Sequence, residues 1–308
     1  MNGPALQALE YAAAALGFSA VGVAPADADQ GGHLQRWLAE GMHAGMDWME
    51  RHLPARLNPQ LVLPGARSVV ILTYEYARRD ARRQPGAVAR YAQGEDYHRL
   101  LAGKLADLDE TLRLYGGVQR CFTDSGPVSE RFFAWRAGLG WIGRNGLLIR
   151  PGRGSYCFLA SMLTTLELPC GSPVKGHCGT CRRCENACPT RALQNGCCDA
   201  RRCLSYWTIE AKEPMPPEIA GAAGTRLYGC DACQEACPWN ASAKEERIDP
   251  HLLMPAELRS LSPAAVAGMG EDEFAARFAG SPIRRAGLAR LVESGVRCAG
   301  RLTRPGEG

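Results

Sequence analysis

The sequence predicts an α+β fold whose first half is α/β-like, followed by a small cysteine-rich domain and a short helical C-terminus. Two observations carry this prediction. Strand and helix patterns alternate through the first half of the 308-residue chain, as expected where helices cover a sheet. Seven of the 14 cysteines then stand in two closely spaced runs. We place the three parts at residues 1–168, 169–245 and 246–308.

The first half contains recognisable helices and strands. Leucines and alanines at helical spacing predict a first helix that ends at Gly17. The segment 96–115 carries five leucines on one face, which predicts an amphipathic helix. Strands are expected at 20–24, 69–73 and 118–123, further helices at 33–40, 46–52 and 130–137, and a loop at 78–94, which contains Arg78, Arg79, Arg82 and Arg83.

Composition excludes several classes of protein. With 46% hydrophobic residues, the chain can bury a substantial core. Apolar runs fall well short of the roughly 20 residues needed to span a bilayer, and the N-terminus lacks the pattern of a signal segment. The cysteines are therefore expected in a reducing cytoplasm and not in disulfides. The net charge of +4 permits a polyanionic partner without requiring one.

The first cysteine run, from Cys178 to Pro189, reads Cys-x2-Cys-x2-Cys-x3-Cys-Pro. This is the ligand spacing of bacterial ferredoxins with two [4Fe–4S] clusters, in which the fourth cysteine binds the other cluster. The second run, from Cys230 to Cys237, is also followed by proline. Structural zinc is the alternative, but zinc usually takes two short pairs separated by a longer spacer. The spacing therefore predicts two [4Fe–4S] clusters.

The two runs supply seven thiolates where two clusters need eight. If the last cysteine crosses back to the first run, the ligands are Cys178, Cys181, Cys184 and Cys237 for one cluster, and Cys188, Cys230 and Cys233 for the other. The eighth ligand is then Cys197, Cys198 or Cys203. We favour Cys203, because it opens a predicted helix and a helix N-terminus stabilises a thiolate.

Asp124 stands at the end of a predicted strand, directly before the turn 125–127. Most aspartates in such a sequence stabilise the turn. The alternative is a general acid or base presented at a strand end, where α/β folds place their chemistry. The following segment 138–146 contains four glycines, which let the backbone approach a neighbour closely. It is compatible with a large flat cofactor or with tight internal packing.

Arginines gather near the C-terminus. Arg290, Arg297, Arg301 and Arg304 are predicted to lie on one helical face, opposed by Glu293 alone. A solvated face is the simpler interpretation of such a run. Contact with nucleic-acid phosphates is the functional one. Three glycines between positions 287 and 300 are expected to weaken this helix.

The chain resembles the epoxyqueuosine reductases, which act in the synthesis of queuosine in bacterial tRNA. The resemblance runs from about residue 5 to residue 290. Its blocks are 41–46, 49–52, 63–68, 90–98, 124–128, 137–145, 178–190 and 230–240. Reductive dehalogenases, which also pair a corrinoid with two clusters, and ferredoxin-like electron carriers are the alternatives. A carrier leaves about 170 residues before the first cysteine run unexplained.

The resemblance implies an oxidoreductase that reduces epoxyqueuosine to queuosine at the wobble position of tRNA anticodons, the last step of queuosine synthesis. It implies a cobalamin-binding domain of the nitroreductase-like, B12-processing type, with cobalamin base-off and no side-chain ligand to cobalt. Two [4Fe–4S] clusters carry electrons from an external low-potential reductant. Asp124 is the implied proton donor, and we expect its carboxyl to be buried beside the corrin with a raised pKa.

Other expectations from the resemblance concern binding residues. Cobalamin contacts are expected at Arg56, Asp124, Arg144, Asn145, Leu148 and Ser205. Many family members continue beyond this length into a helical-repeat module that docks tRNA. If that module is absent, contacts with tRNA are expected at Arg284, Arg285, Arg290 and Arg297. Cys157 and Ser161 depart from the family pattern and are expected to alter the pocket wall. We expect a monomer without membrane association.

Overall fold

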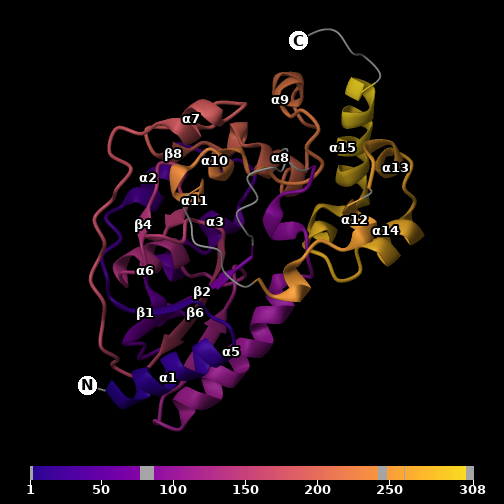
Figure 1. Cartoon of the computed structure of the whole chain (residues 1–308). Coiled ribbons are helices and arrows are strands. Elements are labelled where there is room, and N and C mark those ends of the chain that lie inside the picture. Colours follow the sequence, from indigo (N-terminus) through magenta and orange to yellow (C-terminus); the bar gives the residue numbers. More distant parts are fainter. Residues whose placement is uncertain (1–2, 77–86, 242–247, 260, 303–308) are drawn as a thin grey trace.

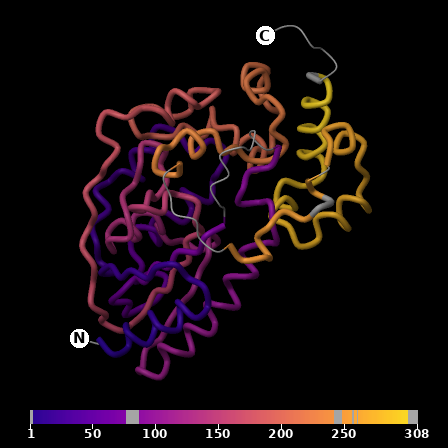
Figure 2. Tube along the Cα trace, in the orientation of Figure 1, coloured from indigo at the N-terminus to yellow at the C-terminus, as the bar shows by residue number. Residues whose placement is uncertain are grey.

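The computed structural model describes residues 3–76, 87–241, 248–259 and 261–302, and mixes helices with sheet (Figure 1). The four arginines of the predicted loop, at positions 78, 79, 82 and 83, lie outside these residues. The two ends of the described chain lie on opposite sides of the molecule, as the Cα trace shows (Figure 2). Within the described ranges, none of the helices combines the length and apolar character that a membrane crossing requires.

A four-stranded sheet forms the centre of the first half. Its order is β1 (Ala20–Pro25), β2 (Ser68–Glu75), β6 (Cys157–Thr164) and β3 (Gln119–Phe122). All three pairings are antiparallel. The α+β assignment is therefore confirmed, and the α/β-like character expected for the first half is wrong, because alternation of strands and helices along a chain does not by itself specify parallel strands.

Helices cover both faces of this sheet. Side chains alternate along a strand, so Val70 and Leu72 of β2 face one cluster while Val69 and Ile71 face the other. The first cluster is closed by α1 (Gly3–Ala15) and α5 (Tyr97–Arg113), the second by α6 (Glu130–Arg136). The leucine face predicted for α5 is buried against the sheet, apart from the half-buried Leu100.

Short elements connect these layers. They are α2 (His33–Ala39), α3 (Trp48–Arg51), α4 (Leu53–Leu57), η1 (Pro59–Leu61), η2 (Arg90–Ala92), β4 (Trp141–Ile142) and β5 (Leu148–Ile149). The hairpin of β4 and β5 explains the glycine-rich segment. A side chain at Gly140 would collide with the Ile149 carbonyl oxygen, 2.3 Å from the added Cβ, and one at Gly138 would meet that of Ser172 at 2.7 Å. These glycines serve tight internal packing.

The cysteine-rich part is built of short elements. They are α7 (Arg183–Ala187), β7 (Leu193–Gln194), β8 (Cys197–Cys198), η3 (Ala200–Arg202), α8 (Leu204–Ile209), α9 (Pro217–Ala222), α10 (Ala232–Glu235) and α11 (Pro238–Ala241). Buried polar groups fasten it to the sheet domain. The Ser155 hydroxyl donates to Gln234 Oε1 at 2.9 Å, and the Asn240 amide donates to the Ser155 hydroxyl at 3.0 Å. A buried network with its partners satisfied fixes one relative position of the two parts.

The C-terminal part is helical, as predicted. It contains η4 (Pro250–Leu252), α12 (Ala256–Arg259), α13 (Pro263–Ala267), α14 (Glu271–Arg277), η5 (Pro282–Ala286) and α15 (Gly287–Leu302). Helix α15 is continuous over 16 residues despite its glycines. Gly295 is required by packing, because a side chain there would meet the Ala267 backbone nitrogen at 2.6 Å.

The arginines of α15 do not form the solvent-facing stripe that was predicted. Arg290 is only 8% exposed, and its guanidinium donates to the carbonyl oxygens of Ala211 and Glu213, both at 2.7 Å. Arg297 donates to the Gly224 carbonyl at 3.0 Å and also to that of Arg226. Both residues hold the α8–α9 region in place. Arg304 and the Arg301 side chain lie outside what the structure describes.

Candidate active site and cysteine sites

Asp124 lies just after β3 in a strained turn. Its φ angle is +57°, a left-handed value that costs a non-glycine residue free energy. The backbone N–H of Asp124 donates to Glu130 Oε1 at 3.3 Å, across the turn that leads into α6. This bond helps to hold the unfavourable backbone conformation. The Asp124 side chain is 62% exposed, so it is presented to solvent at the edge of the sheet domain.

The first turn of α5 supplies two partners to the Asp124 carboxylate. The Tyr97 hydroxyl donates to Asp124 Oδ2 at 2.9 Å, and His98 Nε2 lies 3.7 Å from the same oxygen. The other nitrogen of His98, Nδ1, is 2.7 Å from Oδ1 of Asp96, the residue that caps this helix. The Tyr97 ring stacks on the ring of Phe158, with ring centroids 3.9 Å apart and planes 9° from parallel.

These partners set the ionisation of the site. The neighbouring His98 imidazole lowers the pKa of Asp124, and the Tyr97 hydroxyl lowers it further against the opposing effect of burial. Burial opposes the protonation of His98, but the nearby Asp124 carboxylate and the hydrogen bond with Asp96 outweigh it and raise the His98 pKa above its usual value. The raised pKa expected for Asp124 beside a bound corrin stays a prediction, and in the chain by itself the Asp124 pKa is lowered.

A second carboxyl, Glu130, stands beside Asp124. Its Oε1 accepts the Ser161 hydroxyl at 3.2 Å as well as the Asp124 N–H. Desolvation raises the pKa of Glu130 to about 8, and the charge of Asp124 adds to the rise. Ser161, expected to alter the pocket wall, is fully buried on β6, and its hydroxyl donates the hydrogen bond to Glu130. Cys157, the other departure from the family pattern, has its thiol pKa raised to about 11 by burial.

Two arginines border this group. Arg56, a predicted cobalamin contact, donates to the Val128 carbonyl at 3.2 Å, and its charge acts on both Glu130 and Asp124. Arg285 comes from η5 in the C-terminal part. It forms a two-point ion pair with Glu210, at 2.6 and 3.1 Å, and its positive charge lowers the Asp124 pKa. The site is therefore assembled from the sheet domain and the C-terminal part together.

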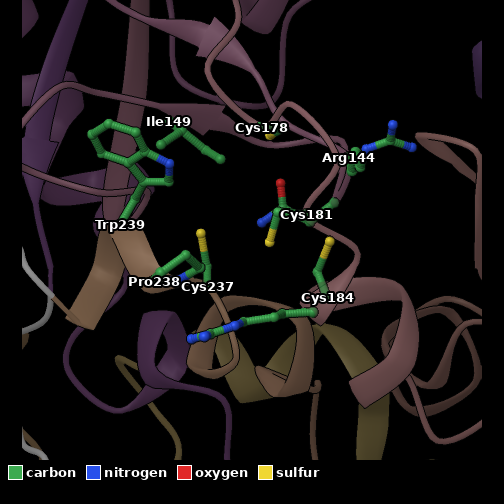
Figure 3. Close-up of a pocket in the computed structure, with 10 residues that line it drawn as sticks. Arg144, Ile149, Cys178, Cys181, Cys184, Cys237, Pro238 and Trp239 are labelled. Atoms are coloured by element: carbon green, nitrogen blue, oxygen red, sulfur yellow. The ribbon is translucent and has the colours of Figure 1, made fainter.

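The first cysteine set surrounds a cavity. Cys178, Cys181, Cys184 and Cys237 all line it, together with Ile149 and Trp239, and the space of about 320 Å³ that they border includes open solvent. Figure 3 shows these four cysteines grouped around one space, with Cys237 on the side of Pro238 and Trp239, and Cys184 on the other side. Burial raises the pKa of the Cys237 thiol, and the nearby Cys178 and Cys181 add to this rise. The predicted crossing of Cys237 to the first run is thus present in the geometry.

The lining of this cavity fits an iron–sulfur cluster. Nδ2 of Asn145 and Nε1 of Trp141 are buried without a hydrogen-bond partner among the described residues, and Asn145 lines the cavity. Cluster sulfides accept hydrogen bonds of this kind. Among the described residues no group of three ligand side chains converges on a point suited to a single metal ion. A cubane does not require such convergence, since each thiolate binds a different iron.

The second cysteine set lies beside Tyr228 and the start of α8. Burial raises the pKa of Cys233, and the thiols of Cys230, Cys203 and Cys188 contribute further, so these four groups are neighbours. The Cys198 thiol lies within hydrogen-bond reach of Cys203, and this contact together with the N-terminal N–H groups of α8 lowers the Cys203 pKa. Cys203 is therefore the better thiolate of the pair.

The other candidates for the eighth ligand differ in position. Cys198 has a raised pKa because it keeps its proton in the bond to Cys203, although it also lies near Cys233 and Cys188. Cys197 instead contacts the Met42 sulfur at 3.5 Å.

The other predicted cobalamin contacts lie in three different surroundings. Arg144 and Asn145 line the first cysteine cavity, where Arg144 donates to Glu185 and to the Gly179 carbonyl. The Leu148 side chain is 3% exposed and belongs to the core beneath α6. Ser205 hydrogen bonds to the Cys203 thiol. In the chain by itself these side chains contact protein groups, and their contact with cobalamin stays a prediction.

Sequence reasoning missed three residues of the Asp124 site. Tyr97, His98 and Glu130 contact Asp124 directly, yet we interpreted them only as parts of helices. A usable signal existed in the polar start of the helix at 96–98. These polar residues did not indicate which strand end the start of the helix would face.

The fold defines a class of redox protein. A catabolic reductive dehalogenase of 17% identity aligns with a TM-score of 0.50 over 94% of this chain and 38% of its own, which shows a shared fold. A family model described as a 4Fe-4S double cluster binding domain matches residues 177–240. The described fold is therefore that of proteins that combine such a cluster domain with an α+β domain.

Closer relatives give the family. The model "Epoxyqueuosine reductase QueG, DUF1730" matches residues 56–125. Epoxyqueuosine reductase of Xanthomonas campestris is 40% identical over 273 residues, covering 85% of this chain and 77% of the relative. The chain belongs to the epoxyqueuosine reductase family.

Solved structures agree with this family. An epoxyqueuosine reductase in complex with an epoxyqueuosine-modified tRNA stem loop, 30% identical, superposes with a TM-score of 0.86 over 95% of this chain and 80% of that one. The Bacillus subtilis enzyme, 29% identical, superposes at 0.84 with the same coverage, and there the loop of its catalytic aspartate is swung out of the active site.

Proposed function

We propose that this chain reduces epoxyqueuosine to queuosine at the wobble position of tRNA anticodons, as the last step of queuosine synthesis. The observation that carries the proposal is Asp124, held in a strained turn with Tyr97 and His98 on its carboxylate, in a chain whose family acts on this nucleoside. A related structure holds an epoxyqueuosine-modified stem loop. The reaction consumes two electrons and two protons and releases the epoxide oxygen as water.

Two [4Fe–4S] clusters are assigned to the cysteine sets described above, with Cys203 as the eighth ligand. Cobalamin is proposed as a third cofactor, since the fold is shared with a B12-dependent dehalogenase. Residues available to hold it are Arg56 and Asp124, beside Glu130. When bound, cobalamin would supply a low-potential metal centre for reduction of the epoxide.

The chemistry assigned to this chain's own residues is proton delivery. An epoxide oxygen leaves readily only when it is protonated, and a positioned general acid accelerates such a step by roughly 10² to 10⁴. Asp124 presents its carboxyl to solvent, and Nε2 of His98, whose pKa is raised, lies 3.7 Å from Asp124 Oδ2. We assign Asp124 as the donor and His98 as the group that returns the proton to it.

Catalysis is assigned to residues 1–168, electron transfer to 169–245 and tRNA contact to 246–308. For tRNA we retain Arg284 and Arg285, which are exposed at η5 near the Asp124 site. Arg290 and Arg297 are not proposed again, because their guanidinium groups are bound to backbone carbonyls. We expect the protein to act as a cytoplasmic monomer supplied by an external low-potential reductant.

The test is conversion of a defined substrate. Protein reconstituted with iron, sulfide and cobalamin, and reduced with methyl viologen, should convert epoxyqueuosine in an anticodon stem-loop to queuosine, detected by nucleoside mass spectrometry. Protein that contains about eight irons and one cobalt yet yields no queuosine would overturn the assignment. Halide release from a bromophenol under the same conditions would favour the dehalogenase alternative.

A further inference from the structure

One surface of the molecule is not explained by the chemistry at Asp124. The segment 171–191 carries the first cysteine run and includes Lys175, His177, Arg182, Arg183 and Arg191, all exposed. We call these five residues the basic rim. They share this segment with Cys178, Cys181 and Cys184, which are half-buried, and Arg183 lines the cavity of the first set.

The exposed charges of this segment have a single sign. Within residues 171–191, all of which the structure describes, Glu185 is the one acidic residue. Its side chain is only 8% exposed and lies 3.4 Å from Arg144 and 3.7 Å from Arg182. The solvent therefore meets four full positive charges and a histidine, with no exposed carboxylate among them. Such a surface steers acidic molecules over a distance of about a Debye length.

The rim is also held in place. The ring of His177 packs against Trp141, with centroids 5.1 Å apart, and the Trp135 indole donates to the Val174 carbonyl at 3.1 Å. A transient electron-transfer complex needs a partner protein to orient quickly and to dissociate quickly. A fixed array of charges beside a partly open redox site favours both.

The second cysteine set lies on the side of Asp124. Tyr228, two residues before Cys230, packs on Tyr91 with ring centroids 6.2 Å apart. Tyr91 in turn packs on Tyr97, which hydrogen bonds to Asp124. This order makes the first set, beneath the basic rim, the outer one.

We propose that the basic rim is the docking surface for a small acidic protein that delivers electrons one at a time to the first cysteine set. The inference rests on the proposed function for the clusters assigned there. In each encounter the carrier loses one electron and the cluster gains it, with no bond made or broken. Two encounters supply the two electrons of one turnover.

The experiment uses the reconstituted holoprotein and an acidic plant-type [2Fe–2S] ferredoxin as the probe, whose potential is about −400 mV. Stopped-flow absorbance would follow cluster reduction, and titration calorimetry would measure ferredoxin binding. The variant is Lys175→Glu with Arg182→Glu, which leaves Arg183 in the cavity lining. The matched control, Arg113→Glu with Arg120→Glu, makes the same charge change on exposed residues around the end of α5, far from α7 (Figure 1).

We expect the rim variant to slow reduction by ferredoxin at least about tenfold at low salt and to weaken binding in parallel. Reduction by methyl viologen, a small cation, should not slow. The control should match the parent chain, and the parent rate should fall as salt rises. A ferredoxin rate that is independent of salt and unchanged in the rim variant would overturn the proposal.

Two further outcomes are also decisive. If the rim variant loses affinity for the tRNA stem-loop while its ferredoxin rate is unchanged, the surface binds nucleic acid and the proposal fails. The proposed function fails separately, if methyl viologen reduces the clusters but no queuosine forms.

Discussion

The Asp124 site and the first cysteine set are built in opposite ways. Three of the four cysteines come from seven consecutive positions, so the local chain itself brings them together. The Asp124 site collects Tyr97, Glu130 and Arg285 from three different elements, and only the finished fold places them side by side. The cysteines of the cluster site are brought together mainly by a short sequence motif, whereas the residues around Asp124 are brought together only by the tertiary structure.

The sharpest test of this contrast is Asp124→Asn. If Asp124 is the proton donor, turnover should fall by roughly 10² to 10⁴, because the amide cannot supply the proton. Iron content and the absorbance of the clusters should be unchanged, since no contact of Asp124 reaches the cysteine sets among the described residues. Single-turnover formation of queuosine measures the effect. Turnover within threefold of the parent chain would remove Asp124 from this role.

Cys203→Ala tests the cysteine side of the comparison. The second set should lose its cluster, so iron should fall from about eight to about four per chain, and turnover with any reductant should fall with it. Cys197→Ala is the matched control, because its thiol contacts Met42 instead of the set. Eight irons in the Cys203 variant, with loss only in Cys203→Ala/Cys198→Ala, would show that the neighbouring Cys198 takes over as ligand.

Glu130 offers a more graded test. Glu130→Ala removes the acceptor of the Asp124 N–H and of the Ser161 hydroxyl. Each bond contributes about 0.5–1.5 kcal/mol, so kcat should fall about tenfold as the strained turn relaxes. Glu130→Gln keeps an acceptor oxygen and should stay within about threefold. Equal losses in the two variants would show that the charge of Glu130 matters, and not its support of the turn.

The pH dependence gives the smallest expected effect. The His98 pKa is raised, so the imidazolium persists above the usual value near 6.5 and is lost as pH rises through the shifted pKa. Turnover that uses His98 to reprotonate Asp124 should therefore decline on the alkaline side. His98→Gln should lower the rate several-fold at neutral pH and remove that decline. An unchanged pH profile in the variant would exclude His98 from proton return.

The sequence predicted the first region far better than the second. Cysteine spacing predicted seven of the eight cysteines assigned to the two sets, because thiolates must reach different irons of one small cluster, but it left the eighth open among three cysteines. At Asp124, the position at a strand end was predictable, but His98 and Glu130 were not linked to it. Arg290 shows the same limit, since helical periodicity places residues on a face without saying whether that face meets solvent or protein.

The contacts that α15 makes with the α8–α9 region have a consequence for the order of folding. Arg290 and Arg297 reach from this last helix to the backbone on either side of α9, within the segment that runs from Cys203 to Cys230. We therefore expect that, during synthesis, the segment between Cys203 and Cys230 is fixed only once α15 has been made. All four cysteines of the first set, the last of which is Cys237, are made before that helix. We expect the two clusters to be inserted in sequence, the outer one first.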